Sequence, residues 1–129
     1  MPLHWRIDVR EKLFLAVADG SVEYDDVERM LDAMASSGAI AYRKLFDGLL
    51  GETRMTPSEL LALGARMRAM HEVAARIGPV AVVIPHDKRL RLMRLLGILA
   101  AADRPLRLFN DLDSAHGWLG ISRDVAESA

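Results

Sequence analysis

The alternation of apolar and polar residues predicts that the chain opens with two strands. Residues 4–9 alternate in type, which is typical of a strand with one solvated face. Residues 13–17 are continuously apolar, which is typical of a strand covered on both faces. The three polar residues between them are of hairpin length, and Asp19-Gly20 then interrupts the pattern. The first two strands are therefore expected to be antiparallel.

Helical periodicity follows in four later segments. The first begins at Glu23, carries an apolar stripe at i, i+3, i+4 and i+7 spacing, and ends before Gly38. The second begins at Thr56-Pro57-Ser58-Glu59, which has the pattern of a capping box, and ends at Gly78-Pro79. The third runs over residues 87–102, with Asp87 as its N-cap, and the fourth begins after Asn110-Asp111 and ends at Gly120.

Between these helices lie three segments with strand character, residues 39–46, 80–84 and 106–109. Strands separated by single helices must run parallel, joined by crossover connections. The order predicts an α/β fold: a five-stranded mixed sheet, mostly parallel with an antiparallel first strand, and four helices. We expect one domain over residues 1–121 and a flexible tail over residues 122–129.

This order and several of its segments resemble the SpoIIAA-like family, which has the STAS fold of anti-sigma-factor antagonists and is related to the SEC14 superfamily. The resemblance rests on the opening hairpin, on Asp25-Asp26-Val27 at the first helix, on Leu45-Phe46-Asp47, and on residues 108–119. It implies a regulatory, non-enzymatic protein-interaction module. In the antagonists, a serine in an Asp-Ser-Ser-Gly segment near the second helix is phosphorylated, whereas residues 54–59 here lack that motif.

Composition narrows the function classes further. The 129 residues include no cysteine, which excludes disulfides, thiol catalysis and thiolate metal sites. The net charge of −1 argues against a nucleic-acid partner. No apolar run reaches the ~20 residues that a membrane span needs, and no export signal is recognisable, so we expect a cytoplasmic protein. The histidine spacing predicts no metal site, and no cofactor motif is present.

Candidate binding residues gather where the parallel strands are expected to end, because open α/β sheets bind ligands there. Two alternatives stay open for the leucine pair beside Gly48 and Gly51: a mobile apolar tip for a partner or ligand, or packing under the second helix. The hydroxyls of the second helix start could receive phosphate or act as caps. The candidate binding residues are Asp47, Leu49, Leu50, Thr56, Ser58, His86, Lys88 and Arg91.

The third predicted helix is apolar around much of its circumference. Leu92, Leu95, Leu96 and Leu99 are expected to face the sheet, which leaves other apolar residues uncovered. These either pack within the subunit or form an interface with a protein partner or a second copy. The candidate interface residues are Leu90, Met93, Arg94 and Ile98.

Three functions are weighed from the sequence. The leading prediction is a non-enzymatic STAS-like interaction module, as the resemblance implies. The alternative is a small apolar ligand or lipid bound in a pocket at the C-terminal ends of the parallel strands. A hydrolase or transferase with His86 and Asp47 in its site is the weakest, since the chain has no G-x-S-x-G nucleophile motif.

Overall fold

Five strands form one mixed sheet in the part of the chain that the computed structural model describes, residues 2–73, 77–88 and 106–122. The strands follow one another across the sheet in chain order. The first pair is antiparallel and all later pairs are parallel. The predicted α/β fold class is confirmed. The strands are β1 (Leu3–Asp8), β2 (Leu13–Val22), β3 (Arg43–Thr53), β4 (Val80–Val83) and β5 (Leu106–Phe109).

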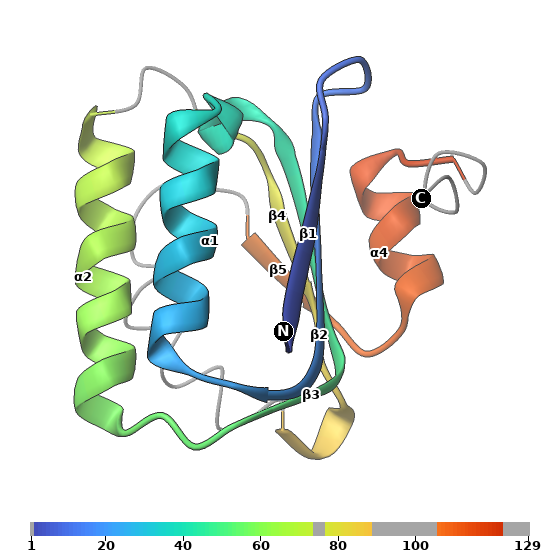
Figure 1. Ribbon diagram of the computed structural model, residues 1–129. Helices are drawn as coiled ribbons and strands as arrows, with labels where there is room; N and C mark the ends of the chain where they lie inside the picture. The colour runs from blue at the N-terminus through green and yellow to red at the C-terminus, as the bar shows by residue number, and fades with distance from the viewer. Residues whose placement is uncertain (1, 74–76, 89–105, 123–129) are drawn as a thin grey trace.

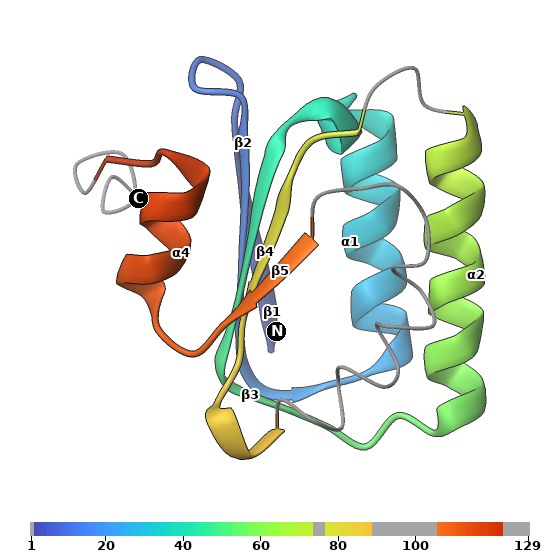
Figure 2. The same ribbon diagram turned by 180° about the vertical axis from the view of Figure 1, so that it is seen from behind.

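Helices lie on both faces of this sheet (Figures 1 and 2). Helices α1 (Tyr24–Ser36) and α2 (Pro57–Val73) stand side by side on one face, and α4 (Leu112–Leu119) covers the other. The third predicted helix enters the described part only at residues 86–88, which are helical. It begins at His86 rather than Asp87, because the Lys88 N–H already donates to the Pro85 carbonyl. Its remainder, like the predicted tail beyond Ser122, lies outside the described residues.

Helix boundaries follow the local capping signals. The expected box at α2 forms: the Thr56 N–H donates to Glu59 Oε1 at 3.0 Å and the Glu59 N–H donates to Thr56 Oγ1 at 3.2 Å. At α4, Asp111 Oδ1 accepts the Ser114 N–H at 2.7 Å. Gly120, at φ 69°, ends that helix in the left-handed conformation that glycine adopts without strain.

The predicted strand over residues 39–46 is wrong at both ends. Residues Ala39–Ala41 form a 3-10 turn that follows Gly38, whose φ of 75° turns the chain out of α1. Strand β3 then begins at Arg43 and continues seven residues beyond Phe46, to Thr53. Its length is set by pairing with β2, a contact between segments that are distant in sequence.

Residues 48–53, which the sequence places beyond the end of the predicted strand, belong to β3 itself. Asp19–Val22 of β2 pair in parallel with Leu50–Thr53 of β3, after a register shift at Val17/Asp19. We call this two-stranded extension the ribbon. The ribbon curves under α1 and α2 (Figure 1).

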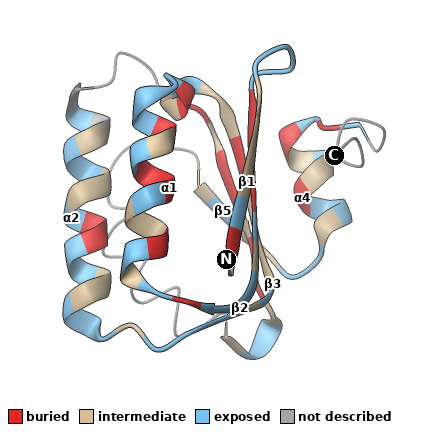
Figure 3. Ribbon diagram, viewed as in Figure 1, coloured by how far each residue is buried: buried red, intermediate tan, exposed pale blue. Residues whose placement is uncertain are grey.

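Two apolar clusters flank the sheet, and their buried residues mark the layers in Figure 3. Strand alternation separates them: Phe14 and Ala16 of β2 face the α1 and α2 side, whereas Leu13 and Leu15 face α4. The buried residues of the first cluster are Leu3, Phe14, Ala16, Val22, Met30, Leu31, Met34, Ala39 and Leu63. Those of the second are Leu13, Leu45, Ala81, Val83, Ala115, Leu119 and Ile121.

Candidate functional site

In the described part of the chain, an apolar cavity of about 540 Å³ lies between the sheet, α1 and α2. Its walls are the inner faces of both helices, and its floor runs along β3, β4 and β5 to the ribbon. The predicted pocket was placed only at the C-terminal strand ends, but the cavity reaches both ends of the parallel strands. The principal lining residues are Met30, Met34, Phe46, Met55, Leu60, Met67, Met70, Val80, Val82 and Leu106.

One wall of this cavity holds a buried lysine. Lys44 is 2% exposed, and its ammonium donates to the carbonyls of Ile40, Tyr42 and Gly78 at 2.5, 3.1 and 3.3 Å. A buried cation is tolerated when polar atoms replace its hydration, and these carbonyls do so. They belong to the 3-10 turn and to the approach to β4. Lys44 therefore joins these segments at the N-terminal end of β3.

At the opposite end of the cavity, a second lysine contacts the ribbon. Lys88 Nζ donates to the Gly51 carbonyl at 3.2 Å. A Cβ on Gly51 would lie only 2.6 Å from the Ala18 Cβ, so the close approach of β2 and β3 here requires glycine. Thr53 Oγ1 donates to the Val22 carbonyl at 2.9 Å and closes the end of the ribbon.

The predicted leucine pair is divided between two environments. Leu49 packs against the cluster beneath α4, on the sheet face opposite α2, so the alternative of packing under the second helix is wrong for this residue. Leu50 is 68% exposed. Asp47 is half-buried and its Oδ1 accepts the Leu49 N–H at 3.2 Å, which shapes the backbone where the ribbon begins.

The hydroxyl candidates near α2 take part in local structure. Thr56 Oγ1 contacts Glu59 in the capping box, and Ser58 is exposed in the first helical turn. Thr53 Oγ1, besides its bond to Val22, accepts the Met55 N–H at 3.1 Å. Both threonine hydroxyls thus contribute hydrogen bonds that hold the connection between the ribbon and α2.

His86 is exposed in the first turn after Pro85, whereas Asp47 is half-buried and bonded to the backbone. Within the described ranges, no three His, Asp or Glu side chains converge so as to hold a metal ion. Among the described residues, no helix combines the length and apolarity that crossing a bilayer requires. The remaining candidates, Arg91 and the interface residues Leu90, Met93, Arg94 and Ile98, lie outside the described residues.

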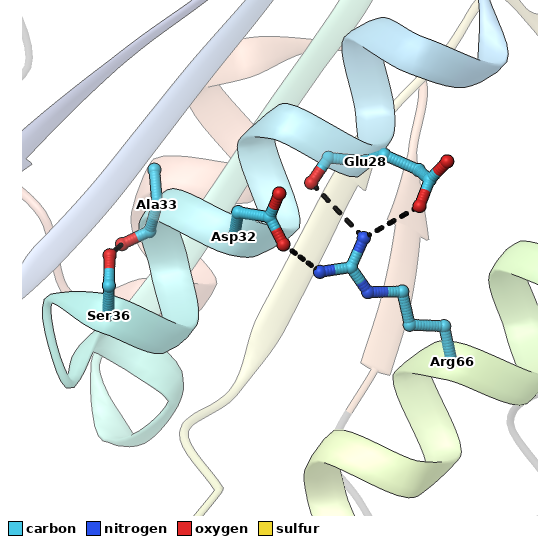
Figure 4. A network of polar contacts seen from close by, with 5 residues as sticks. All are labelled: Glu28, Asp32, Ala33, Ser36 and Arg66. Carbon is cyan, nitrogen blue, oxygen red and sulfur yellow. Dashed lines mark hydrogen bonds and ion pairs between the residues drawn. The ribbon is translucent and has the colours of Figure 1, made fainter.

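Two basic residues that the sequence analysis did not select organise the helix layers. Arg66 of α2 bonds the Glu28 carbonyl at 3.3 Å, the Glu28 carboxylate at 3.1 Å, and Asp32 on the next turn of α1 (Figure 4). Arg43 donates to the carbonyls of Leu119 and Gly120 at 2.9 and 3.1 Å, which ties the end of α4 to β3. In the sequence, Arg66 lies beside the apolar stripe of the second helix, and Arg43 interrupts the apolar run of residues 39–46.

The pKa of the Asp111 carboxyl is shifted by its surroundings. The Ser114 backbone N–H and then the Ser114 hydroxyl donate to Asp111, and these bonds lower the pKa of that carboxyl. The group is solvated at the start of α4. It belongs to helix capping and not to the cavity.

The comparisons with known proteins bear on the fold. The sequence matches no protein-family model and no curated protein. The structure is similar to the crystal structure of an anti-sigma factor antagonist from Mycobacterium paratuberculosis, with a TM-score of 0.58 and 14% identity. The match covers 92% of this chain and 94% of that chain. The chain therefore has the fold of an anti-sigma factor antagonist, as the resemblance implied.

Proposed function

We propose that this protein is a regulatory protein-interaction module of the anti-sigma-factor-antagonist type, acting by binding and not by catalysis. The observation that supports this proposal is the fold similarity over nearly the whole of both chains. A binding role is also consistent with an exposed His86 and with hydroxyls engaged in caps. We expect the protein to act in the bacterial cytoplasm, with a partner protein or a second copy of itself.

We place the partner-binding surface on the segment from Leu50 to Leu61, the outer side of the ribbon and the start of α2. Leu50 is 68% and Leu61 46% exposed, two of the large apolar residues that remain solvated in the described part of the chain. Glu52 and Arg54 are both exposed and lie between the two leucines in the sequence. Exposed apolar residues bordered by charged residues are typical of protein interfaces.

Site-specific cross-linking tests the surface. A photoreactive amino acid is placed at Leu50 and, as the matched control, at Val9, which is also aliphatic and 68% exposed but lies beyond β1 in the opening hairpin. We expect one discrete cross-linked product from position 50, either with another protein or at twice the chain mass. The same yield of the same product from position 9, or none from position 50, would contradict the proposal.

A second candidate function, binding of a small apolar ligand or lipid, is favoured by the apolar cavity. Its volume is within the ~300–1,000 Å³ range of small-molecule sites. This function requires the cavity to be open in the native protein. Titration with a fluorescent fatty acid tests it, and saturable binding with one site per chain is the expected result.

A further inference from the structure

We propose that the free edge of β1 is a homodimer surface, at which the β1 strands of two copies of this chain pair antiparallel about a two-fold axis at Trp5. This interface goes beyond the interaction function and does not rest on the Leu50–Leu61 surface. It is made by backbone hydrogen bonds, and its occupant is a second copy of the chain. A monomer, or a dimer built on another surface, is the outcome that would contradict it.

Strand β1 is an edge strand with little to block further pairing. It pairs with β2 on one side, and no strand in the described part of the chain lies on its other side (Figure 1). Proteins ordinarily protect an edge by a short strand, a bulge or a proline within the strand. The opposite edge strand, β5, has four residues, whereas β1 has six, pairs with β2 without a register shift and contains neither proline nor glycine.

The hydrogen-bond phase of β1 identifies the backbone groups that point to its free edge. Opposite residues of an antiparallel pair alternate between hydrogen-bonded and non-hydrogen-bonded positions. The Asp19 N–H donates to the Pro2 carbonyl at 2.7 Å, and these two residues continue the β1–β2 register by one position. The even-numbered residues of β1 therefore bond β2. The N–H and C=O groups of the odd-numbered residues, Leu3, Trp5 and Ile7, point away from it.

Two such edges satisfy each other in one register. A two-fold axis perpendicular to the sheet keeps every side chain on its own face, so the pairing must be centred on a residue. With Trp5 opposite Trp5 of the second copy, Leu3 lies opposite Ile7 of the second copy, and every outward N–H and C=O group finds a partner. A register centred on Arg6 would instead place two guanidinium groups opposite each other and leave the groups of Leu3 without a strand partner.

The side chains of the two copies also match in this register. The three odd-numbered residues pack against the cluster on the α1 side, so leucine meets isoleucine and tryptophan meets tryptophan there. On the other face, Arg6 and Asp8 of each copy form an ion pair at 3.6 Å. Asp8 is the diagonal neighbour of His4 of the second copy, which places a carboxylate beside an imidazole N–H at each end of the interface. A second copy is thus complementary to this edge in polarity and in charge.

The first test is the dimerisation constant of the full-length protein, measured by sedimentation equilibrium. His4 is exposed, and in this register it lies opposite Arg6 of the second copy. We expect His4→Lys to weaken the dimer about 5-fold and His4→Glu to tighten it about 5-fold, because two symmetric cross-strand charge pairs change at once.

Ala69→Lys and Ala69→Glu are the matched controls, since Ala69 is exposed on α2 and the net charge changes equally. Both controls should dimerise like the wild type. A wild type that stays monomeric at about 1 mM, or His4 variants that behave like the Ala69 variants, would overturn the proposal.

Amide hydrogen exchange, followed by NMR in the unmodified protein, tests the hydrogen bonds themselves. The N–H groups of Leu3, Trp5 and Ile7 gain a partner only in the dimer, so their exchange should slow as the protein concentration rises through the dimerisation constant. The N–H of Arg6 bonds β2 in both states and should be protected at all concentrations. Dimerisation without added protection at the three odd-numbered residues would place the interface on another surface, and would overturn the proposal.

Discussion

The contact between Gly78 and the 3-10 turn predicts a large effect from a small substitution. A Cβ at position 78 would lie 2.0 Å from the Tyr42 carbonyl oxygen and 2.6 Å from that of Ala41, both of them backbone atoms. Real Cβ atoms do not approach within 3.0 Å, so Gly78→Ala must separate the two segments. The Gly78 N–H donates to the Ile40 carbonyl at 3.0 Å, and the Gly78 carbonyl accepts from Lys44 at 3.3 Å.

The magnitude follows from those two hydrogen bonds. Losing a neutral bond costs about 1 kcal/mol, and a bond to a charged group about 1.5–3 kcal/mol. The smaller unfolded-state entropy of alanine offsets about 0.4–1 kcal/mol. We expect Gly78→Ala to lower the free energy of unfolding by about 2–3 kcal/mol, measured by urea denaturation followed by circular dichroism.

Gly117 supplies the matched control. It lies in α4, and a Cβ there would meet nothing within 4 Å. Gly117→Ala should therefore raise the free energy of unfolding by about 0.5–1 kcal/mol, through helix propensity. A Gly78→Ala variant as stable as the wild type, or more stable, would refute the close packing of this turn.

Two other substitutions test the buried cation and the α4 cap. Lys44→Met removes the donor from three carbonyls and should cost about 2–3 kcal/mol of unfolding free energy; an unchanged urea midpoint would contradict this. The pKa of Asp111 is lowered in the folded protein. Its contribution to the free energy of unfolding is therefore present above the unfolded-state pKa and is lost as the pH falls through the folded-state pKa. The stability difference between wild type and Asp111→Asn should shrink in acid, and growth of that difference would contradict the assignment.

Local signals were sufficient to predict where α2 and α4 begin and where α4 ends. The Thr56–Glu59 box, the Asp111 cap and Gly120 act within one or two turns, so sequence spacing alone determines them. The strand directions also followed, because strands separated by single helices must run parallel.

The extent of β3 could not be predicted in the same way. Asp47-Gly48 has the composition of a strand end, but pairing with β2 carries the strand through it to Thr53. Gly51 has a packing role there, since Ala18 approaches closely. Such a role depends on a partner strand about thirty residues earlier in the sequence, and local pattern does not record it.

Of the predicted binding residues, the structure places Lys88 in the lining of the cavity. Leu50 is solvated, as a partner-binding residue would be, whereas Leu49 belongs to the core beneath α4. Lys44 interrupted an apolar run in the sequence and had no sign of its burial, because the carbonyls around it come from three separate positions. Cavity walls and buried cations both arise from tertiary packing.

Binding affinity at the Leu50–Leu61 surface tests the central claim most directly. The partner is first identified by cross-linking from position 50 and then purified. Calorimetry measures the dissociation constant of its complex with the wild type, with Leu50→Asp and with Val9→Asp. Replacing an apolar interface anchor costs about 2 kcal/mol, which is about 30-fold in Kd. We expect that loss for Leu50→Asp and no change for Val9→Asp, which is equally exposed in the wild type. Equal affinities for all three proteins would contradict the account.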